Sequence, residues 1–147
     1  MDTERDGFTM VELVVVMAVI AVLLAIGFPT FMGIADAASD RSAQADVRAV
    51  LLAERALWLD AETYTADAGL ITDFSPGAQV AADPADGVFV DLHDADDTIV
   101  CLVRLSESGR VFSVWEHATA GTYFGETDLS AADCPAALPD GYAQGGW

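Results

Sequence analysis

The side chains that could bind a metal are few in this sequence. The two histidines are His93 and His117, and His93 lies in an acidic run at residues 91–97. Calcium needs six or more oxygen ligands in a defined geometry, and the spacing of this run does not match an EF-hand loop. We interpret the run as a solvated hairpin turn, with calcium binding as the alternative, and His117 as a turn residue at a strand end. The sequence predicts no metal site and no cofactor.

Candidate nucleophiles also lack a catalytic motif. Ser106 and Ser108 flank Glu107, but the chain has no GxSxG, HExxH or CxxC pattern. It has no Lys, which excludes Schiff-base chemistry and a P-loop, and no Asn, which excludes N-glycosylation. The sequence therefore predicts a protein that is not an enzyme.

Charge and hydropathy are segregated along the chain. The 147 residues include six Arg and 24 Asp and Glu, for a net charge of −18, yet 53% are hydrophobic. Residues 13–35 carry no charge, whereas residues 36–147 carry 20 acids and five Arg. Phosphate binding needs clustered Lys and Arg, so this balance disfavours nucleic-acid partners.

The uncharged run of 23 residues is long enough to cross a bilayer once as a helix. A secretory signal peptide would have a basic start and a shorter apolar core, so ordinary cleavage beyond the run is the lesser alternative. Gly27 and Pro29 interrupt the run, and Pro removes a helical hydrogen bond. We expect a kink or a melted stretch near them.

Glu12 stands at the N-terminal edge of this run. From physics alone, two interpretations are equally good. The acid lies at the membrane surface, or it is carried into an apolar bundle, where it needs a positive partner.

The N-terminal residues resemble a known family. The sequence GFTMVEL at residues 7–13, followed by the apolar run, resembles the class III signal of type IV pilins and pseudopilins, and Pro29 matches the family's helix-breaking Pro. The resemblance covers about residues 7–33. It implies cleavage by a prepilin peptidase between Gly7 and Phe8, N-methylation of Phe8, and a role for Glu12 in assembly, paired with the free amine of a neighbouring subunit. The leader is acidic apart from Arg5, unlike the basic family leaders, so the orientation rests on the resemblance.

The helical pattern continues from residue 36 to 62 with one apolar stripe, which contains Glu54 without an evident reason. Arg41, Arg48 and Arg55 recur every seven residues and share one flank. We favour a solvated face with local pairs to the nearby acids Asp40, Asp46, Glu54 and Asp60. The alternative is a contact stripe for the acidic heads of neighbouring subunits.

Residues 60–86 hold turn signals and predict a loop region that can include a short turn of helix. β-branched and aromatic residues then recur in runs at 88–92, 98–105, 110–116 and 122–124. These runs predict an antiparallel meander of three or four strands, with one face on the apolar stripe of the helix. The tail from Gly125 shows no period.

The even cysteine count permits one disulfide in an oxidising compartment. The resemblance implies a head outside the cytoplasm and a bridge between Cys101 and Cys134 that fastens the tail to the sheet. Two free buried thiols are the alternative.

Together these observations predict an α+β pilin fold. The expected parts are a leader at 1–7, a transmembrane or filament-core helix at 8–35, its amphipathic continuation at 36–62, and the rest of the head at 63–147. The implied function is a structural subunit of a non-covalent, homopolymeric type IV pilus, since a chain without Lys has no Lys-linked bonds. The implied partners are further copies, prepilin peptidase, the assembly platform and minor pilins. The precursor would sit in the inner membrane, and the product in an extracellular filament. Alternatives are a minor pilin, a pseudopilin of a type II secretion or DNA-uptake machine, and a membrane-tethered domain that does not polymerise.

Overall fold

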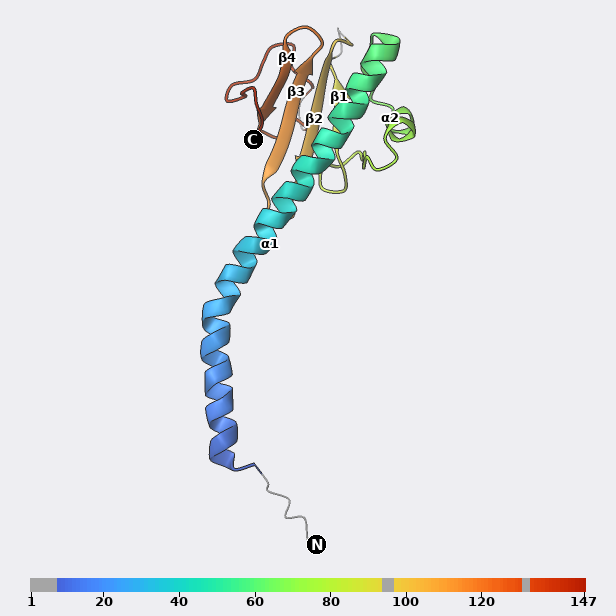
Figure 1. The fold of residues 1–147 in the computed structure, drawn as a ribbon. Helices are drawn as coiled ribbons and strands as arrows, with labels where there is room; N and C mark the ends of the chain where they lie inside the picture. The colour runs from blue at the N-terminus through green and yellow to red at the C-terminus, as the bar shows by residue number, and fades with distance from the viewer. Residues whose placement is uncertain (1–7, 94–96, 131–132) are drawn as a thin grey trace. The chain divides into compact units, whose positions relative to one another are not determined.

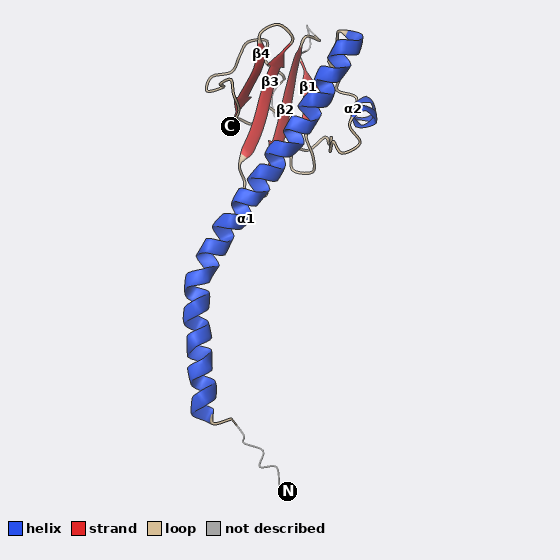
Figure 2. Cartoon of the chain, in the orientation of Figure 1, coloured by secondary structure: helices blue, strands red, loops and turns tan. Residues whose placement is uncertain are grey.

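The computed structural model describes residues 8–93, 97–130 and 133–147. Its elements are α1 (Met10–Ala61), α2 (Ala68–Phe74), β1 (Phe89–Leu92), β2 (Ile99–Leu105), β3 (Val111–His117) and β4 (Gly121–Gly125) (Figure 1). The predicted α+β arrangement, a long apolar helix followed by an antiparallel sheet, is confirmed (Figure 2). The chain divides into two compact units between Asp36 and Ala37. We call residues 8–36 the apolar segment and residues 37–147 the head.

The apolar segment is helical from Met10 onwards, without a break at Gly27 or Pro29. The melted stretch that the sequence allowed is therefore not formed, while the kink stays a prediction. The helix is long and apolar enough to cross a membrane, and none of its most apolar window is buried within the chain. Large apolar side chains are exposed all round it, which is the pattern of a helix that lipid or other protein must cover.

The head is built around a four-stranded meander in the order β1-β2-β3-β4, with every neighbouring pair antiparallel. The C-terminal half of α1 covers one face of this sheet (Figure 1). The apolar stripe of α1 packs against alternate strand residues, and the buried cluster includes Val47, Val50, Leu51, Val100, Leu102 and Val114. The predicted packing of the helix on the sheet is thus present.

The opposite face of the sheet is covered by the segment that follows β4. Here a second buried cluster joins Ile99, Cys101, Val103 and Trp115 of the strands to Leu129, Cys134 and Tyr142. Because helix and tail cover opposite faces, β2 is buried on both, and this burial explains its unbroken apolar sequence.

The connection between α1 and the sheet is more ordered than the sequence indicated. Glu62 adopts a positive φ of 55° just after α1 ends. Tyr64 then folds back so that its ring lies 4.8 Å from that of Trp58. Asp67 caps α2 by accepting from the N–H of Gly69 at 2.8 Å. The short helix at Ala68–Phe74 fits the expected turn of helix within this region.

Candidate functional site

The start of α1 is held by a reciprocal pair of polar residues. Glu12 N–H donates to Thr9 Oγ1 at 3.2 Å, and Glu12 Oε2 accepts from Thr9 N–H at 3.3 Å. This is a capping box, in which the sequence T-x-x-E satisfies two backbone donors that a helix start leaves open. The sequence reasoning missed it, although residues 9–12 contain the signature.

The residues of the expected processing site are only partly described. Gly7 and the rest of the leader at 1–7 lie outside the described residues. Phe8 is exposed just before the capping box, and Pro29 lies within the continuous α1. Cleavage after Gly7, methylation of Phe8 and the assembly roles of Glu12 and Pro29 therefore stay predictions.

The tail is fastened to the sheet by a Cys101–Cys134 disulfide, with a Cα–Cα distance of 5.6 Å. This predicted bridge is confirmed. Asp91 Oδ2 accepts from Cys134 N–H at 2.9 Å, and His93 Nδ1 lies 2.8 Å from the Cys134 carbonyl oxygen. Two members of the acidic run thus position the bridge. Residues 94–96 of that run lie outside the described residues, so the question of calcium there is not tested.

The Arg flank of α1, formed by Arg41, Arg48 and Arg55, makes none of the local pairs that we favoured among the described residues. Arg55 reaches across to Glu116 of β3, with Nε 3.0 Å from Oε1, and also donates to the hydroxyl of Thr122. Arg48 lies over the ring of Trp147, 5.4 Å from its centroid. Long side chains on α1 therefore bind the chain's own sheet and tail. Arg41 is exposed and has no partner among the described residues.

Two of the acids on α1, Asp40 and Asp46, also pair outside the helix, which corrects the same prediction. Asp40 binds Arg110 at 3.1 Å and accepts from Ser108 Oγ at 2.5 Å, and Asp46 lies 3.5 Å from Arg104 Nε. The hydrogen bond from Ser108, followed by those from Ser106 and Arg110, lowers the pKa of Asp40 against the opposing effect of burial. Sequence spacing alone favoured neighbours on the helix because the turn after β2 could not be placed beside it.

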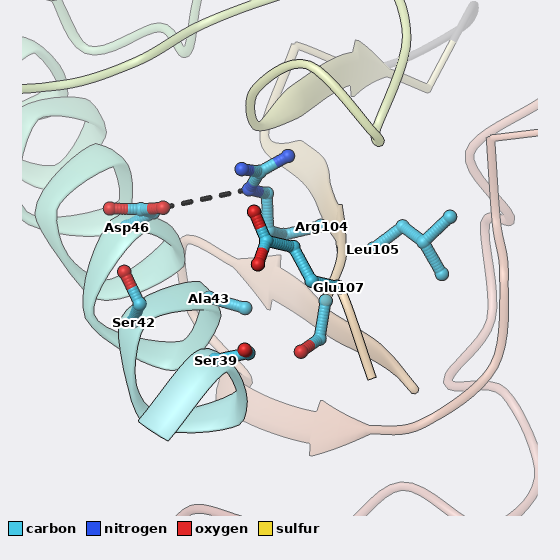
Figure 3. Close-up of a pocket in the computed structure, with 8 residues that line it drawn as sticks. Ser39, Ser42, Ala43, Asp46, Arg104, Leu105 and Glu107 are labelled. Carbon is cyan, nitrogen blue, oxygen red and sulfur yellow. Dashed lines mark ion pairs between the residues drawn. The ribbon is translucent and has the colours of Figure 1, made fainter. Parts of the chain in front are cut away.

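A small cavity opens in the head between α1 and the end of β2, with a volume of about 130 Å³. Polar side chains line it from both sides: Ser39, Ser42, Asp46, Arg104, Ser106 and Glu107. Figure 3 shows Asp46 and Arg104 facing each other across it, with the Glu107 carboxylate turned towards the same space. We call it the polar pocket.

Arg104 is held at the wall of the polar pocket by backbone carbonyls. Its Nη1 donates to the carbonyl oxygens of Pro84 at 2.9 Å and Ala85 at 2.6 Å. Its buried Nε has no hydrogen-bond acceptor among the described residues, because the contact with Asp46 is long. Glu107 has no partner there.

Glu54 is an unusual core residue. Its side chain is fully buried, Oε2 accepts from Thr65 N–H at 3.1 Å, and Oε1 has no partner among the described residues. Burial raises the pKa of Glu54 to about 7, against the opposing effect of the Thr65 bond. Glu54 thus lies within the apolar stripe to tie residues 62–67 to α1, a role that periodicity could not reveal.

Trp147 is a further feature that the sequence did not indicate. Its Nε1–H donates to the Gly125 carbonyl at 2.7 Å, and its ring meets Phe112 and Phe124 edge-on, at 5.5 and 4.8 Å. Positive φ angles at Gly145 and Gly146 let the chain turn inward before it. The Gly-Gly-Trp sequence at 145–147 was the signal that could have indicated this turn.

The comparison with known families concerns the N-terminus. Residues 4–28 match the prokaryotic N-terminal methylation motif. This segment is a class III signal of type IV pilins and pseudopilins. The motif implies processing by a prepilin peptidase and assembly by pilus-type machinery, and together with the apolar helix it is consistent with a membrane-anchored precursor. The head of this pilin-like chain lies outside the matched residues. No curated protein matches the chain significantly in sequence.

Proposed function

We propose that this pilin-like chain is a structural subunit of a type IV pilus, a non-covalent helical filament. The observation that carries the proposal is the methylation motif at 4–28, which includes the start of α1, where the helix is apolar on all sides. Such a helix is stable only when lipid or other helices surround it. As a precursor it spans the membrane once, with the head outside the cytoplasm, where the Cys101–Cys134 bridge can form.

Processing prepares the chain for assembly. Prepilin peptidase removes residues 1–7 between Gly7 and Phe8, and the new N-terminus at Phe8 is methylated. The bonds that cap α1 join Thr9 to Glu12, so they do not depend on the leader. The mature helix therefore keeps its first turn when the leader is lost.

Glu12 supplies the charge that registers neighbouring helices. A carboxylate in an apolar filament core is costly unless it is paired. In a bundle of parallel helices staggered along the axis, Glu12 of one copy meets the free amine at Phe8 of another, and the two charges neutralise each other. Pro29 keeps its proposed family role in shaping the core helix. The assembly platform and minor pilins act on this N-terminal helix during polymerisation.

Mass analysis of the mature chain and of sheared surface filaments tests the proposal. We expect a protein that starts at Phe8, carries one added methyl group, and is the main component of the filaments. A mature chain that retains residues 1–7 would contradict the proposal and indicate a tethered domain that does not polymerise. A trace amount in filaments would instead indicate a minor pilin or a secretion or DNA-uptake pseudopilin.

A further inference from the structure

The polar pocket of the head carries an unbalanced charge. Two carboxylates, Asp46 and Glu107, line it with a single guanidinium, that of Arg104, which leaves one excess negative charge. At roughly 30 Å³ for each water, its volume of about 130 Å³ holds about four waters. The pocket thus has the size and the charge to receive one cationic side-chain head group together with water.

The chain offers one cationic group of matching chemistry. Four of the five Arg residues in the head, at positions 48, 55, 104 and 110, contact other groups of the same chain. Arg41 alone is exposed without a partner among the described residues. Its guanidinium would carry the hydrogen-bond donors that carboxylates and seryl hydroxyls accept.

Arg41 does not face the polar pocket of its own chain. At about 100° per residue, the pocket residues Ser42, Asp46 and Ser39 lie roughly 100°, 140° and 160° away from Arg41 around the axis of α1. The donor and the acceptor therefore occupy different sides of the same helix. A contact between the Arg41 side of one copy and the pocket side of another is heterologous, because the two surfaces differ. Such a contact can repeat from copy to copy and build an open helical filament.

We propose that Arg41 of one copy inserts its guanidinium into the polar pocket of a second copy, between Asp46 and Glu107. This inference rests on the proposed function, since it names a head-to-head contact within the filament. Of the three residues in the Arg flank, Arg41 is the contact residue, because Arg48 contacts the chain's own tail and Arg55 its own sheet.

Two further observations support a second copy as the occupant. Residues 36–147 carry 20 acids against five Arg, so neighbouring heads repel each other unless opposite charges meet locally. Leu52 and Leu59 follow Arg41 on the same side of α1 and are 66% and 85% exposed. At 1.5 Å rise per residue they lie about 16 and 27 Å further along the helix axis, so they extend the same face of α1 with apolar area that a neighbouring head would cover.

A charge swap in the full-length chain tests the contact. Arg41→Glu and Glu107→Arg are expected to lower the yield of sheared filaments by about tenfold each, since reversal places like charges together. The double variant R41E/E107R restores opposite charges and should return the yield to within about twofold of wild type. The matched control is R41E combined with Asp73→Arg, an exposed acid on α2, which should not restore it. Near-UV circular dichroism of each variant confirms that the head is folded, and Glu107→Gln, which only neutralises the charge, serves if E107R does not fold.

The outcomes separate this inference from the proposed function. Wild-type chains that yield no filaments contradict the proposed function. Wild-type filaments together with unchanged yields for R41E and E107R, or for E107Q where E107R does not fold, overturn the contact alone. Equal rescue by E107R and D73R also overturns it, because a general reduction in repulsion would then explain the gain.

Discussion

Thr9 and Glu12 bind each other through both backbone and side chain at the first turn of α1. Glu12 therefore has two separable properties, an oxygen that accepts from Thr9 N–H and a negative charge. The local hydrogen bond is visible in one chain, whereas the charge needs a partner from another chain. Substitutions at these two positions can distinguish the contributions.

Glu12→Gln keeps an oxygen acceptor for the capping box but removes the charge, whereas Glu12→Val removes both. We expect both variants to be cleaved normally and to form few filaments. Thr9→Ala keeps the charge but loses the cap, at a cost of about 1 kcal/mol in helix stability, and should still assemble. Filament yield and N-terminal mass are the measurements. Normal filaments from the Gln variant would show that capping, and not the charge, is what assembly requires.

Glu54 should make the stability of the head depend on pH. Its folded-state pKa is raised from 4.5 to about 7, so the protonated form favours folding. The contribution is fully present below about pH 4.5 and is lost as pH rises through 7. The free-energy difference between Glu54→Gln and wild type should therefore move in favour of the variant by up to about 3 kcal/mol between pH 5 and 8. Thermal unfolding of the detergent-solubilised chain, followed by near-UV circular dichroism, measures it. A difference that stays constant with pH contradicts the assignment.

The Cys101–Cys134 bridge closes a loop with a sequence separation of 33. Replacing both residues by Ser should lower the free energy of unfolding by about 3–4 kcal/mol, since the unfolded chain regains its freedom. Thermal unfolding of the variant and of wild type with and without reductant gives the comparison. Reductant should lower the stability of wild type and leave that of the double variant unchanged. A double variant as stable as wild type would show that the tail is held by its other contacts.

Trp147 connects the tail to β3, β4 and α1. Trp147→Ala should destabilise the head by about 2–4 kcal/mol, because it leaves Arg48 and the rings of Phe112 and Phe124 without their partner. Trp147→Phe keeps an aromatic ring but loses the donor to Gly125, and should cost less. The exposed Leu138→Ala is the control and should change stability by less than about 0.5 kcal/mol. Equal melting temperatures for Trp147→Ala and the control would contradict this role.

Local patterns predicted most of the fold. Runs of β-branched and aromatic residues located all four strands to within about two residues, and the stripe at Val47, Val50 and Leu51 identified the buried face of α1. The methylation motif was recognisable because its residues are contiguous, so the spacing of Gly7, Phe8 and Glu12 is itself the signal.

Contacts between distant segments could not be predicted in the same way. Asp46 of α1 and Arg104 of β2 are far apart in the sequence, and only the packing of α1 on the sheet brings them together. Glu54 appeared as an exception within the apolar stripe. The N–H group from which it accepts a hydrogen bond belongs to Thr65, which lies in a loop without periodicity. Trp147 follows two glycines, whose backbone freedom hides where the ring will go.

The sequential order of the strands also has a consequence for how the head acquires its structure. Each strand pairs with the next one along the chain, so closing each hairpin costs little entropy, and such local topologies fold fast. Docking of α1 joins Val47 and Val50 to Val114, which are much farther apart in the chain, and should follow later. In that interval the apolar face of the sheet is uncovered and prone to aggregate, and the helix that will protect it is already part of the same chain.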